Sequence, residues 1–507
     1  MSTTYAAAGS GSRIAARLYL AALLLTLSWG LLAFGAVYPW AYTPLGFAAI
    51  VVGGLGLVLG RSRPWTERPV ALALALIGVV AALQLVPLPA ALLSRISPNT
   101  LRFLESVDLT WVFGTRGAHP VSIAPAKTWL GLSLFVAFAV LLLGSARGFG
   151  RFGVLAFVRA LIAIGVGVAL FAIVQAALNA GRLAYEVKIY GFWQPIYRAT
   201  PFGPFVNRNH FAGWMLLVLP IAVAYLCGMI ERGLRHVPGT WRHRTLWMGS
   251  PEGGRAVLMA LAVSVMGLSL LASQSRSGLS SLTLALVLAG GWLAITRGGL
   301  RRLALPLLGL AIAGIILLAW AGAGVALGRF STAGSELGTR LAAWHDAVRI
   351  VSQFPLMGTG LNTYGSATLL YQTTSRSMHF QEAHNEYLQI AAEGGLLLTA
   401  AVVFCLWRLI RIARSRFTEG NEPTLARWTR IGAATALIAI AFQSLMEFSL
   451  QMPGNAALFA VVAAIAIHAG GAEPQRQSSH GHRTMLSRRG EGVGPRRSTR
   501  TTDDAGN

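Results

Sequence analysis

Several apolar segments of the chain adjoin polar residues whose types suit the binding of an anion. Asn207, Arg208 and Asn209 directly precede one apolar segment, and Arg276 lies in a short hairpin, 273–278, between two others. A guanidinium group so close to hydrocarbon needs an anionic partner, and its fork of donors matches the oxygens of a diphosphate. The alternative role for Arg276 is a salt bridge within the protein, and for Arg208 it is contact with lipid headgroups.

His384 opens another polar segment, at the start of a later apolar run. A neutral imidazole is the side chain best able to accept a proton near neutral pH, so His384 is the candidate general base. Asn385, Gln389 and Glu393 follow at helical spacing, which predicts one polar stripe that enters the apolar run. A carboxylate inside a span is costly unless it has a partner. We therefore expect Glu393 to face the interior of the bundle and to pair with an arginine, chiefly in a structural role.

Two more charged residues complete this set. Arg340 begins a periodic stretch that includes Trp344, which predicts an amphipathic helix within a long polar segment. Its guanidinium group either stacks on the Trp344 ring or turns toward the site. Glu447 is spaced four residues from both Gln443 and Gln451, which predicts a shared helical face near the end of the eleventh apolar run. Glu447 is a candidate for balancing the arginines or for ordering an acceptor.

The elements that must position these residues are membrane-spanning helices. The chain is 54% hydrophobic and only 12% charged, which is more apolar surface than one water-facing core requires. A hydrocarbon layer about 30 Å thick needs about 20 apolar residues per helix. About twelve segments meet this criterion, so we predict an all-α integral membrane protein with a retained first span. The segments are 18–37, 43–60, 70–88, 128–145, 153–175, 211–230, 256–273, 279–296, 303–325, 387–407, 431–448 and 454–470.

The arginines predict how these helices are oriented, because short arginine-rich loops stay in the cytoplasm. Arginines occur in every second loop, which places residues 1–17 in the cytoplasm and the long segments 89–127, 180–209 and 326–383 on the other side. The net charge of +24 follows from this pattern, which argues against a nucleic-acid partner. Residues 471–507 lack apolar periodicity, so we expect a disordered, basic cytoplasmic tail.

The sequence offers few ligands for a metal ion. Cys227 and Cys405 both lie inside apolar runs, which excludes a disulfide framework and a thiolate metal site. Before the tail the only aspartates are Asp108 and Asp346, and no paired acidic motif occupies a predicted outer segment. We therefore expect neither a metal nor a cofactor.

Four motifs, taken in order, resemble those of the O-antigen ligase and polysaccharide polymerase family. They are NRNHFA at 207–212, SQSRSG at 273–278, Arg340 with Trp344 followed by Pro355 and Gly358, and HNEYL at 384–388 with Glu393 and Gly394. The resemblance covers roughly residues 200–460, whereas the first five spans resemble the family only in general hydropathy. We accordingly divide the spans into an N-terminal set at 18–175 and a ligase-like or polymerase-like core at 176–470, followed by the tail.

The resemblance implies a membrane glycosyltransferase with a GT-C-like helical fold, a large periplasmic loop and an undecaprenyl-diphosphate-linked glycan as donor. It implies transfer without a metal at the periplasmic face of a bacterial inner membrane, in contact with membrane lipids. Residues of the motifs that would bind the diphosphate are Arg208, Arg276 and Arg340, and His384 would engage the acceptor, which is a glycan or lipid A-core. Further candidates for binding substrate are Asn207, Asn209, Asn385, Glu393 and Glu447.

The motifs leave several functions open. A polymerase joins repeat units, a ligase hands the finished chain to lipid A-core, and a relative of both glycosylates proteins. The long first outer segment, with Pro87, Pro89, Ser97 and Pro98, resembles members found with exopolysaccharide pathways and favours a polymerase slightly. Twelve spans also suit a transporter or a flippase for lipid-linked sugars, although the halves show no two-fold repeat and the polar residues gather at one face. A non-catalytic scaffold would leave the outer arginines and His384 without a role.

Overall fold

The computed structural model of the chain describes residues 10–60, 65–114, 117–183, 186–195, 200–235, 237–238, 240–296, 337–374, 379–418 and 422–470. The apolar run predicted at 303–325 and the tail predicted at 471–507 lie outside these residues.

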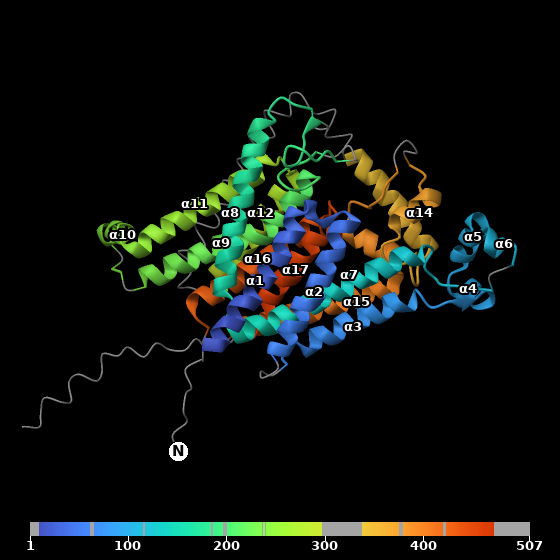
Figure 1. Cartoon of the computed structure of the whole chain (residues 1–507), viewed down its shortest axis with the longest axis horizontal. Coiled ribbons are helices and arrows are strands. Elements are labelled where there is room, and N and C mark those ends of the chain that lie inside the picture. The colour runs from blue at the N-terminus through green and yellow to red at the C-terminus, as the bar shows by residue number, and fades with distance from the viewer. Residues whose placement is uncertain are drawn as a thin grey trace, which may run out of the picture. The chain divides into compact units, whose positions relative to one another are not determined.

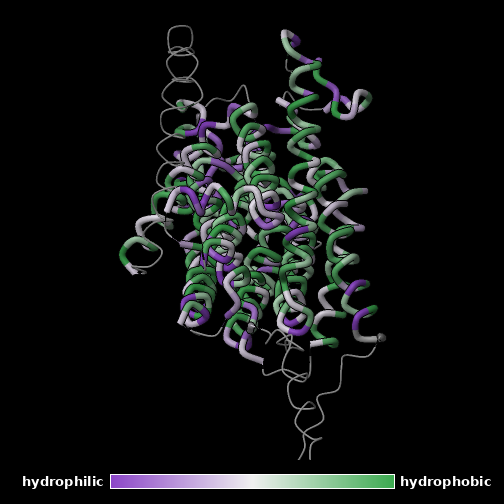
Figure 2. Tube along the Cα trace, turned by 90° about the vertical axis from the view of Figure 1, so that its left-hand side faces the viewer, coloured by the Kyte–Doolittle hydropathy of each residue, from purple (hydrophilic) through white to green (hydrophobic). Residues whose placement is uncertain are grey.

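Within the described residues, nine helices are long and apolar enough to cross a membrane. They are α1 (Ser10–Leu32), α2 (Pro39–Leu59), α7 (Pro125–Phe152), α8 (Leu155–Leu178), α9 (Arg208–Leu234), α11 (Pro251–Ala272), α12 (Arg276–Thr296), α15 (Glu386–Thr418) and α16 (Thr424–Gln443). Two shorter apolar helices are α3 (Arg68–Leu83) and α17 (Pro453–Ile467). The traced helices are hydrophobic over most of their length (Figure 2). The prediction of an all-α integral membrane protein is confirmed, and these eleven helices coincide with eleven of the predicted runs.

Helix α9 lies in the interior of the bundle, in contact with α8, α11, α12 and α16 (Figure 1). Of its most apolar 18-residue window, 83% is buried, the largest share among the nine long helices. A helix that is apolar on all sides must be surrounded by other helices or by lipid, and the described part of the chain supplies helices. Because α9 and α16 pack along each other, they link the two ends of the bundle.

Close helix packing in the N-terminal half depends on glycine. Helix α2 lies beside α7 (Figure 1), and a Cβ atom on Gly144 would come within 1.9 Å of the Gly53 carbonyl oxygen. Small residues let helix backbones approach closely in a membrane, where dispersion contacts rather than the hydrophobic effect drive association. Gly53 and Gly144 therefore determine how closely the backbones of α2 and α7 approach each other.

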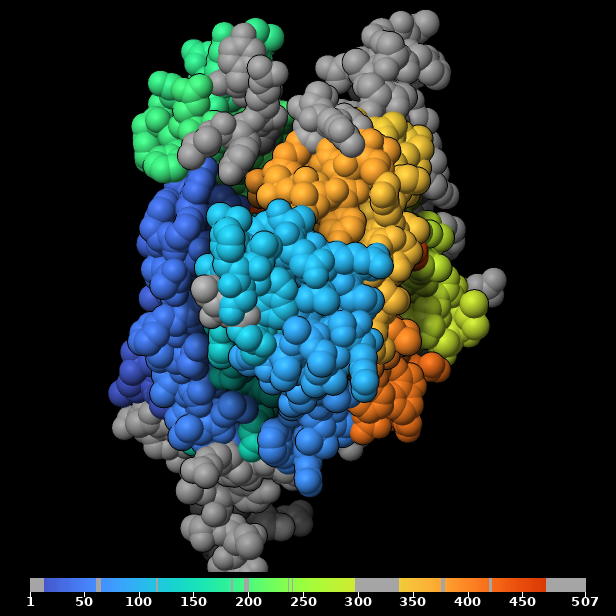
Figure 3. Space-filling view, turned by 90° about the vertical axis from the view of Figure 1, so that its right-hand side faces the viewer, coloured from blue at the N-terminus to red at the C-terminus, as the bar shows by residue number. Residues whose placement is uncertain are grey.

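Two segments between spans pack together outside the long helices. The first holds β1 (Leu88–Pro89), α4 (Ala90–Ile96), α5 (Pro98–Val107), α6 (Leu109–Val112) and β2 (Ala118–His119), with β1 antiparallel to β2. The second holds a helix at 337–353, in the segment predicted to be helical, and α14 (Tyr364–Tyr371). The buried side chains of the helix at 337–353 include Ala343, Ala347 and Ile350, whereas Leu341 and Val348 of the predicted apolar face are exposed. The Asn99 side chain donates to the Gln353 carbonyl at 2.7 Å, and Ile123 N–H donates to Thr359 O at 2.9 Å. Figure 3 shows the two segments side by side, in light blue and in yellow to orange.

The glycine-rich turn after the 337–353 helix is inserted into a break in α15. Gly395 has a φ of 58° inside α15, so the helix is interrupted there. The carbonyl of Glu393 then accepts a hydrogen bond from Gly360 N–H at 2.9 Å, and Leu396 N–H donates to Pro355 O at 2.8 Å. Gly358, with a φ of 68°, lies against the Glu393 backbone. The turn and the break therefore satisfy each other's backbone groups.

The remaining short elements connect the spans. They are η1 (Phe34–Ala36), α10 (Trp241–Met248) and η4 (Ser449–Gln451). Helix α16 ends at Gln443, so the predicted helical face shared by Gln443, Glu447 and Gln451 is wrong. Residues 444–448 form a turn instead, which brings Glu447 back toward α9.

Candidate functional site

Five chain segments meet at one end of the bundle. Helices α9, α12 and α15 begin there, α16 ends there, and Arg340 of the helix at 337–353 reaches Glu447 there. We call five residues that connect these segments the Glu447 cluster: Asn209, Ser275, Arg340, His384 and Glu447. They are far apart in sequence, and a network of hydrogen bonds and ion pairs joins them.

Glu447 is the centre of this network and its side chain is fully buried. Its Oε1 atom accepts a hydrogen bond from Asn209 Nδ2 at 2.7 Å and forms an ion pair with Arg340. Ser275 Oγ in turn donates to Asn209 Oδ1 at 2.8 Å. A buried carboxylate is stable only when paired and hydrogen-bonded, and here one oxygen takes both partners. The ion pair turns Arg340 toward the site rather than onto the Trp344 ring.

His384 faces the second oxygen of the same carboxylate. Its Nδ1 atom lies 3.8 Å from Glu447 Oε2, too far for a hydrogen bond. The ring packs edge-on against Phe448 with centroids 4.8 Å apart, and Trp344 Nε1 donates to the His384 carbonyl at 3.4 Å. The backbone of His384 is left-handed, with a φ of 51°, a conformation that costs free energy for a residue with a Cβ. These contacts hold the imidazole at the start of α15 with 30% of its side chain exposed.

Buried polar atoms that lack a hydrogen bond are concentrated here among the described residues. They include His384 Nδ1, Glu447 Oε2, Gln443 Oε1 and His210 Nε2. Buried polar atoms in native proteins are normally satisfied, so a group of unsatisfied ones calls for a bound polar ligand or water. This end of the bundle is therefore the candidate functional site.

The two remaining candidate arginines lie at the beginnings of helices. Arg208 is the first residue of α9, is half-buried, and follows the N-cap Asn207, whose side chain accepts from Asn209 N–H at 2.9 Å. Arg276 is the first residue of α12 and is exposed, and its side chain makes no hydrogen bond or ion pair with the described residues. Free N–H groups and the helix dipole make helix N-termini favourable for anions. Each arginine thus adds a full positive charge to an end that is already electropositive.

A buried carboxyl group fixes the turn that carries Glu447. Glu386 Oε1 accepts from Leu450 N–H at 2.8 Å, and Glu386 Oε2 accepts from Gln451 Nε2 at 2.7 Å. Glu386 N–H also donates to the Ser444 carbonyl at 2.9 Å. The start of α15 is consequently tied to the turn, which keeps the backbone segments of His384 and Glu447 next to each other.

The rest of the polar stripe serves the fold of the loop. Asn385 caps α15, with its Oδ1 accepting from Tyr387 N–H at 3.0 Å. Glu393 accepts from Asn362 N–H at 2.7 Å and from Tyr364 N–H at 3.1 Å. The expected arginine partner of Glu393 is wrong, since backbone donors of the turn replace it. In the described part of the chain, the side-chain hydrogen bonds of these two residues go to the loop and to α15 rather than to the side chains of the Glu447 cluster.

Sequence reasoning did not assign roles to Ser275, Glu386, Phe448 or His210 in the site. Ser275 and His210 stand inside the motifs, next to the arginines, but their partners are distant in sequence. His210 also packs edge-on against the Phe448 ring, with ring centroids 4.8 Å apart. No periodic pattern signals such contacts, because a turn rather than a helix presents Phe448.

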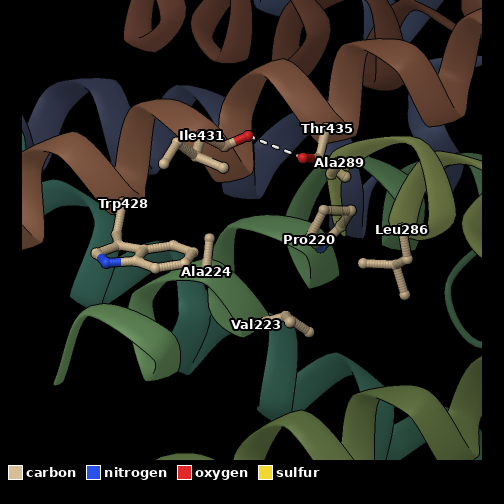
Figure 4. Close-up of a pocket in the computed structure, with 8 residues that line it drawn as sticks. All are labelled: Pro220, Val223, Ala224, Leu286, Ala289, Trp428, Ile431 and Thr435. Atoms are coloured by element: carbon tan, nitrogen blue, oxygen red, sulfur yellow. Dashed lines mark hydrogen bonds between the residues drawn. The ribbon is translucent and has the colours of Figure 1, made fainter. Parts of the chain in front are cut away.

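The part of the chain that the structure describes contains no group of three His, Cys, Asp or Glu side chains placed to hold a metal ion. It does contain a small apolar pocket between α9, α12 and α16, lined by residues that include Pro220, Leu286 and Trp428 (Figure 4). The Thr435 hydroxyl at this pocket donates to the Ile431 carbonyl at 2.9 Å. With its hydroxyl satisfied, the pocket offers an apolar lining and no reactive group.

Residues 261–403 match the family model described as O-antigen ligase, which confirms the resemblance to that family. The matched region contains Ser275, Arg276, Arg340 and His384, whereas Glu447 lies beyond it. No curated protein matches the chain.

Proposed function

From the O-antigen ligase-related domain and the Glu447 cluster, we propose that this membrane protein transfers a glycan from an undecaprenyl-diphosphate carrier to an acceptor hydroxyl. The family match supports a function of the O-antigen ligase or polymerase type, and so a glycosyltransferase-like enzyme. The carrier, a metal-independent inverting reaction, and a site on the periplasmic face of the bacterial inner membrane are parts of the proposal. The acceptor is a second glycan or lipid A-core.

The observation that carries the proposal is the position of His384. The imidazole is partly exposed, lies 3.8 Å from a buried carboxylate, and stands in a site that also receives arginines from three segments. A proton acceptor beside fixed positive charges suits a reaction that deprotonates a hydroxyl and expels an anion. A buried histidine with a purely structural role is expected to have its ring nitrogens hydrogen-bonded, whereas Nδ1 of His384 has no hydrogen bond.

In the proposed reaction the acceptor oxygen attacks the sugar C1 from the face opposite the phosphate. The new C1–O bond forms as the C1–O bond to phosphate breaks, and the diphosphate leaves with the electron pair. His384 takes the hydroxyl proton, and Arg208, Arg276 and Arg340 stabilise the charge that grows on the diphosphate. Fixed donors of this kind typically contribute about 10²-fold to 10³-fold in rate each.

Asn207, Asn209, Asn385, Glu393 and Glu447 complete the proposed substrate site. Asn209 and Glu447 act within the cluster itself, through the contacts described above. Asn207 and Asn385 cap α9 and α15, so they place Arg208 and His384 at the mouth of the site. Glu393 acts from the α15 break, where it orders the loop that faces the substrate.

The test is transfer by the purified protein in liposomes, with a lipid-diphosphate glycan as donor and EDTA in the buffer. Products longer by whole repeats identify a polymerase, and glycan on lipid A-core identifies a ligase. A His384→Ala variant should lose transfer by about 10²-fold or more while it remains inserted in the membrane. Donor that stays chemically intact but crosses the bilayer would contradict the proposal and indicate a transporter.

A further inference from the structure

The two oxygens of the Glu447 carboxylate differ in their bonding partners. Oε1 holds both Arg340 and Asn209, whereas Oε2 is buried, accepts no hydrogen bond, and points toward the equally unsatisfied Nδ1 of His384. The gap of 3.8 Å between Oε2 and Nδ1 is less than an ångström longer than a hydrogen bond. An imidazole and a carboxylate in this relation form a base and its orienting partner once the gap closes.

Resting on the function proposed above, we propose that Glu447 is the positioning residue for His384 and that Arg340 controls its availability. In the structure Arg340 neutralises the carboxylate. When the donor binds, its diphosphate competes for the Arg340 guanidinium, and Glu447 becomes free to accept a hydrogen bond from His384 Nδ1–H. The base is therefore oriented and strengthened only when a donor is present.

The exchange of partners is favourable because of the chemistry of each group. A guanidinium group binds a carboxylate and a phosphate with the same fork of donors, and a diphosphate carries more charge than one carboxylate. The Arg340 side chain is 24% exposed, so it can reach a ligand from where it lies. Asn209 keeps its hydrogen bond to Oε1, so Glu447 retains one anchor while Arg340 moves.

Other charged and titratable groups around His384 would stay in place. Helix α9 contributes His210 and Arg208, α12 contributes Arg276, and α15 contributes Glu386, which is held by Leu450 N–H and Gln451. Two carboxylates, Glu386 and Glu447, are among the groups around His384. Both oxygens of Glu386 already accept hydrogen bonds, whereas Oε2 of Glu447 accepts none. Only Glu447, in the described part of the chain, offers His384 an unsatisfied carboxylate oxygen.

Once Arg340 has moved from Glu447 to the diphosphate, each proton released in the reaction has an acceptor. The acceptor O–H proton passes to His384 Nε2 as the oxygen bonds to C1, and the diphosphate departs with the electron pair of the broken C1–O bond. The imidazolium that results keeps its Nδ1–H on Glu447 Oε2, and the carboxylate balances its charge without taking the proton. The Nε2 proton returns to water after the products leave.

The decisive variants are Glu447→Gln and Arg340→Gln, studied by steady-state transfer as a function of pH in liposomes. Glu447→Gln should lower kcat by about 10²-fold with a smaller change in the KM for donor. It should also move the acidic limb of the pH–rate profile to lower pH, because the imidazolium loses its carboxylate. Arg340→Gln should raise the KM for donor and move the same limb to higher pH, because the carboxylate is no longer neutralised.

The double variant tests whether Arg340 acts through Glu447. In a Glu447→Gln background, the further Arg340→Gln change should leave the acidic limb where Glu447→Gln put it. Glu447→Asp should restore part of kcat, and Glu382→Gln, a matched carboxyl-to-amide change in the loop before α15, should leave the limb unmoved. Limbs that do not move in either single variant, in protein of wild-type thermal stability, would overturn this inference and leave the proposed transfer intact.

Failure of the proposed function looks different. If the wild-type protein transfers no glycan in the same liposomes, the reaction is wrong, and the role of Glu447 falls with it. If the wild-type protein transfers and Glu447→Gln transfers at the same rate, only the positioning role is overturned.

Discussion

At one end of α9 and α16 the carboxylates of Glu231 and Glu422 have partners on both oxygens, whereas at the other end Glu447 has partners on only one. Away from the Glu447 cluster, Glu231 accepts from Arg427 at 2.7 Å and from Trp428 Nε1 at 2.6 Å. Nearby, Arg430 donates to Glu422 at 2.7 Å and to the Ala466 carbonyl at 2.8 Å. These contacts close the C-terminal end of α9 and the N-terminal end of α16, and they leave the carboxylates no open position.

The Glu447 cluster also contains a carboxylate and an arginine, but one oxygen of its carboxylate has no hydrogen bond. Glu447 Oε2 and His384 Nδ1 face each other without a hydrogen bond, and Arg276 stands exposed without a described partner. Completed pairs stabilise a fold, while incomplete ones retain binding capacity for a ligand. Substitutions at the paired end should therefore affect stability, and those at the cluster should affect transfer.

The largest expected effect on stability is at the paired end. Arg430→Ala should destabilise the protein by about 3–5 kcal/mol, because it leaves Glu422 and a buried carbonyl without their donor. Arg430 is only 1% exposed, so water cannot replace it. Thermal unfolding in detergent measures the loss, and Arg235→Ala is the matched control, since Arg235 is half exposed and should cost less than about 1 kcal/mol. Equal melting temperatures for the two variants would contradict the comparison.

The second prediction concerns stability that comes from backbone packing, rather than from charge pairing, at the Glu447 end of the bundle. Gly358→Ala should destabilise the protein by about 2–3 kcal/mol, because its φ is 68° and a Cβ would lie 2.3 Å from the Glu393 backbone. Gly338→Ala is the control, because a Cβ there meets nothing within 4 Å and the residue lies in a helix. We expect Gly338→Ala to be neutral or stabilising in the same unfolding measurement. A tolerated Gly358→Ala would show that the turn does not depend on the break in α15.

The smallest effect is a pH dependence of stability near the site. Burial raises the pKa of the Glu382 carboxyl group from its usual 4.5 to about 8. Between these pH values the folded protein holds a proton that the unfolded chain has released, so stability should fall as pH rises toward 8. The change should be about 1 kcal/mol for this half-buried group, after screening by solvent. Unfolding of Glu382→Gln across this pH range should show a flatter slope, and an unchanged slope would assign the titration elsewhere.

The sequence predicted the spans well because each one is a local property of about 20 residues. Arginine placement and the order of the motifs also predicted that Arg208, Arg276, Arg340 and His384 share one end of the bundle, and the structure shows their segments meeting there. The partners of Glu393 and Glu447 were not predictable. A break at Gly395 and a turn after Gln443 decide them. Glu393 is bound at the break by Asn362, 31 positions away, and the turn brings Glu447 to Asn209, 238 positions away.

We propose that the Glu447 end of the bundle transfers a glycan from a lipid diphosphate. The most direct test is transfer in liposomes by Arg276→Ala beside Arg235→Ala, two exposed arginines from opposite ends of the bundle. We expect Arg276→Ala to lose about 10²-fold or more of the rate with unchanged thermal stability, while Arg235→Ala transfers normally. Near-normal transfer by Arg276→Ala would contradict the proposal and make Arg276 a structural residue.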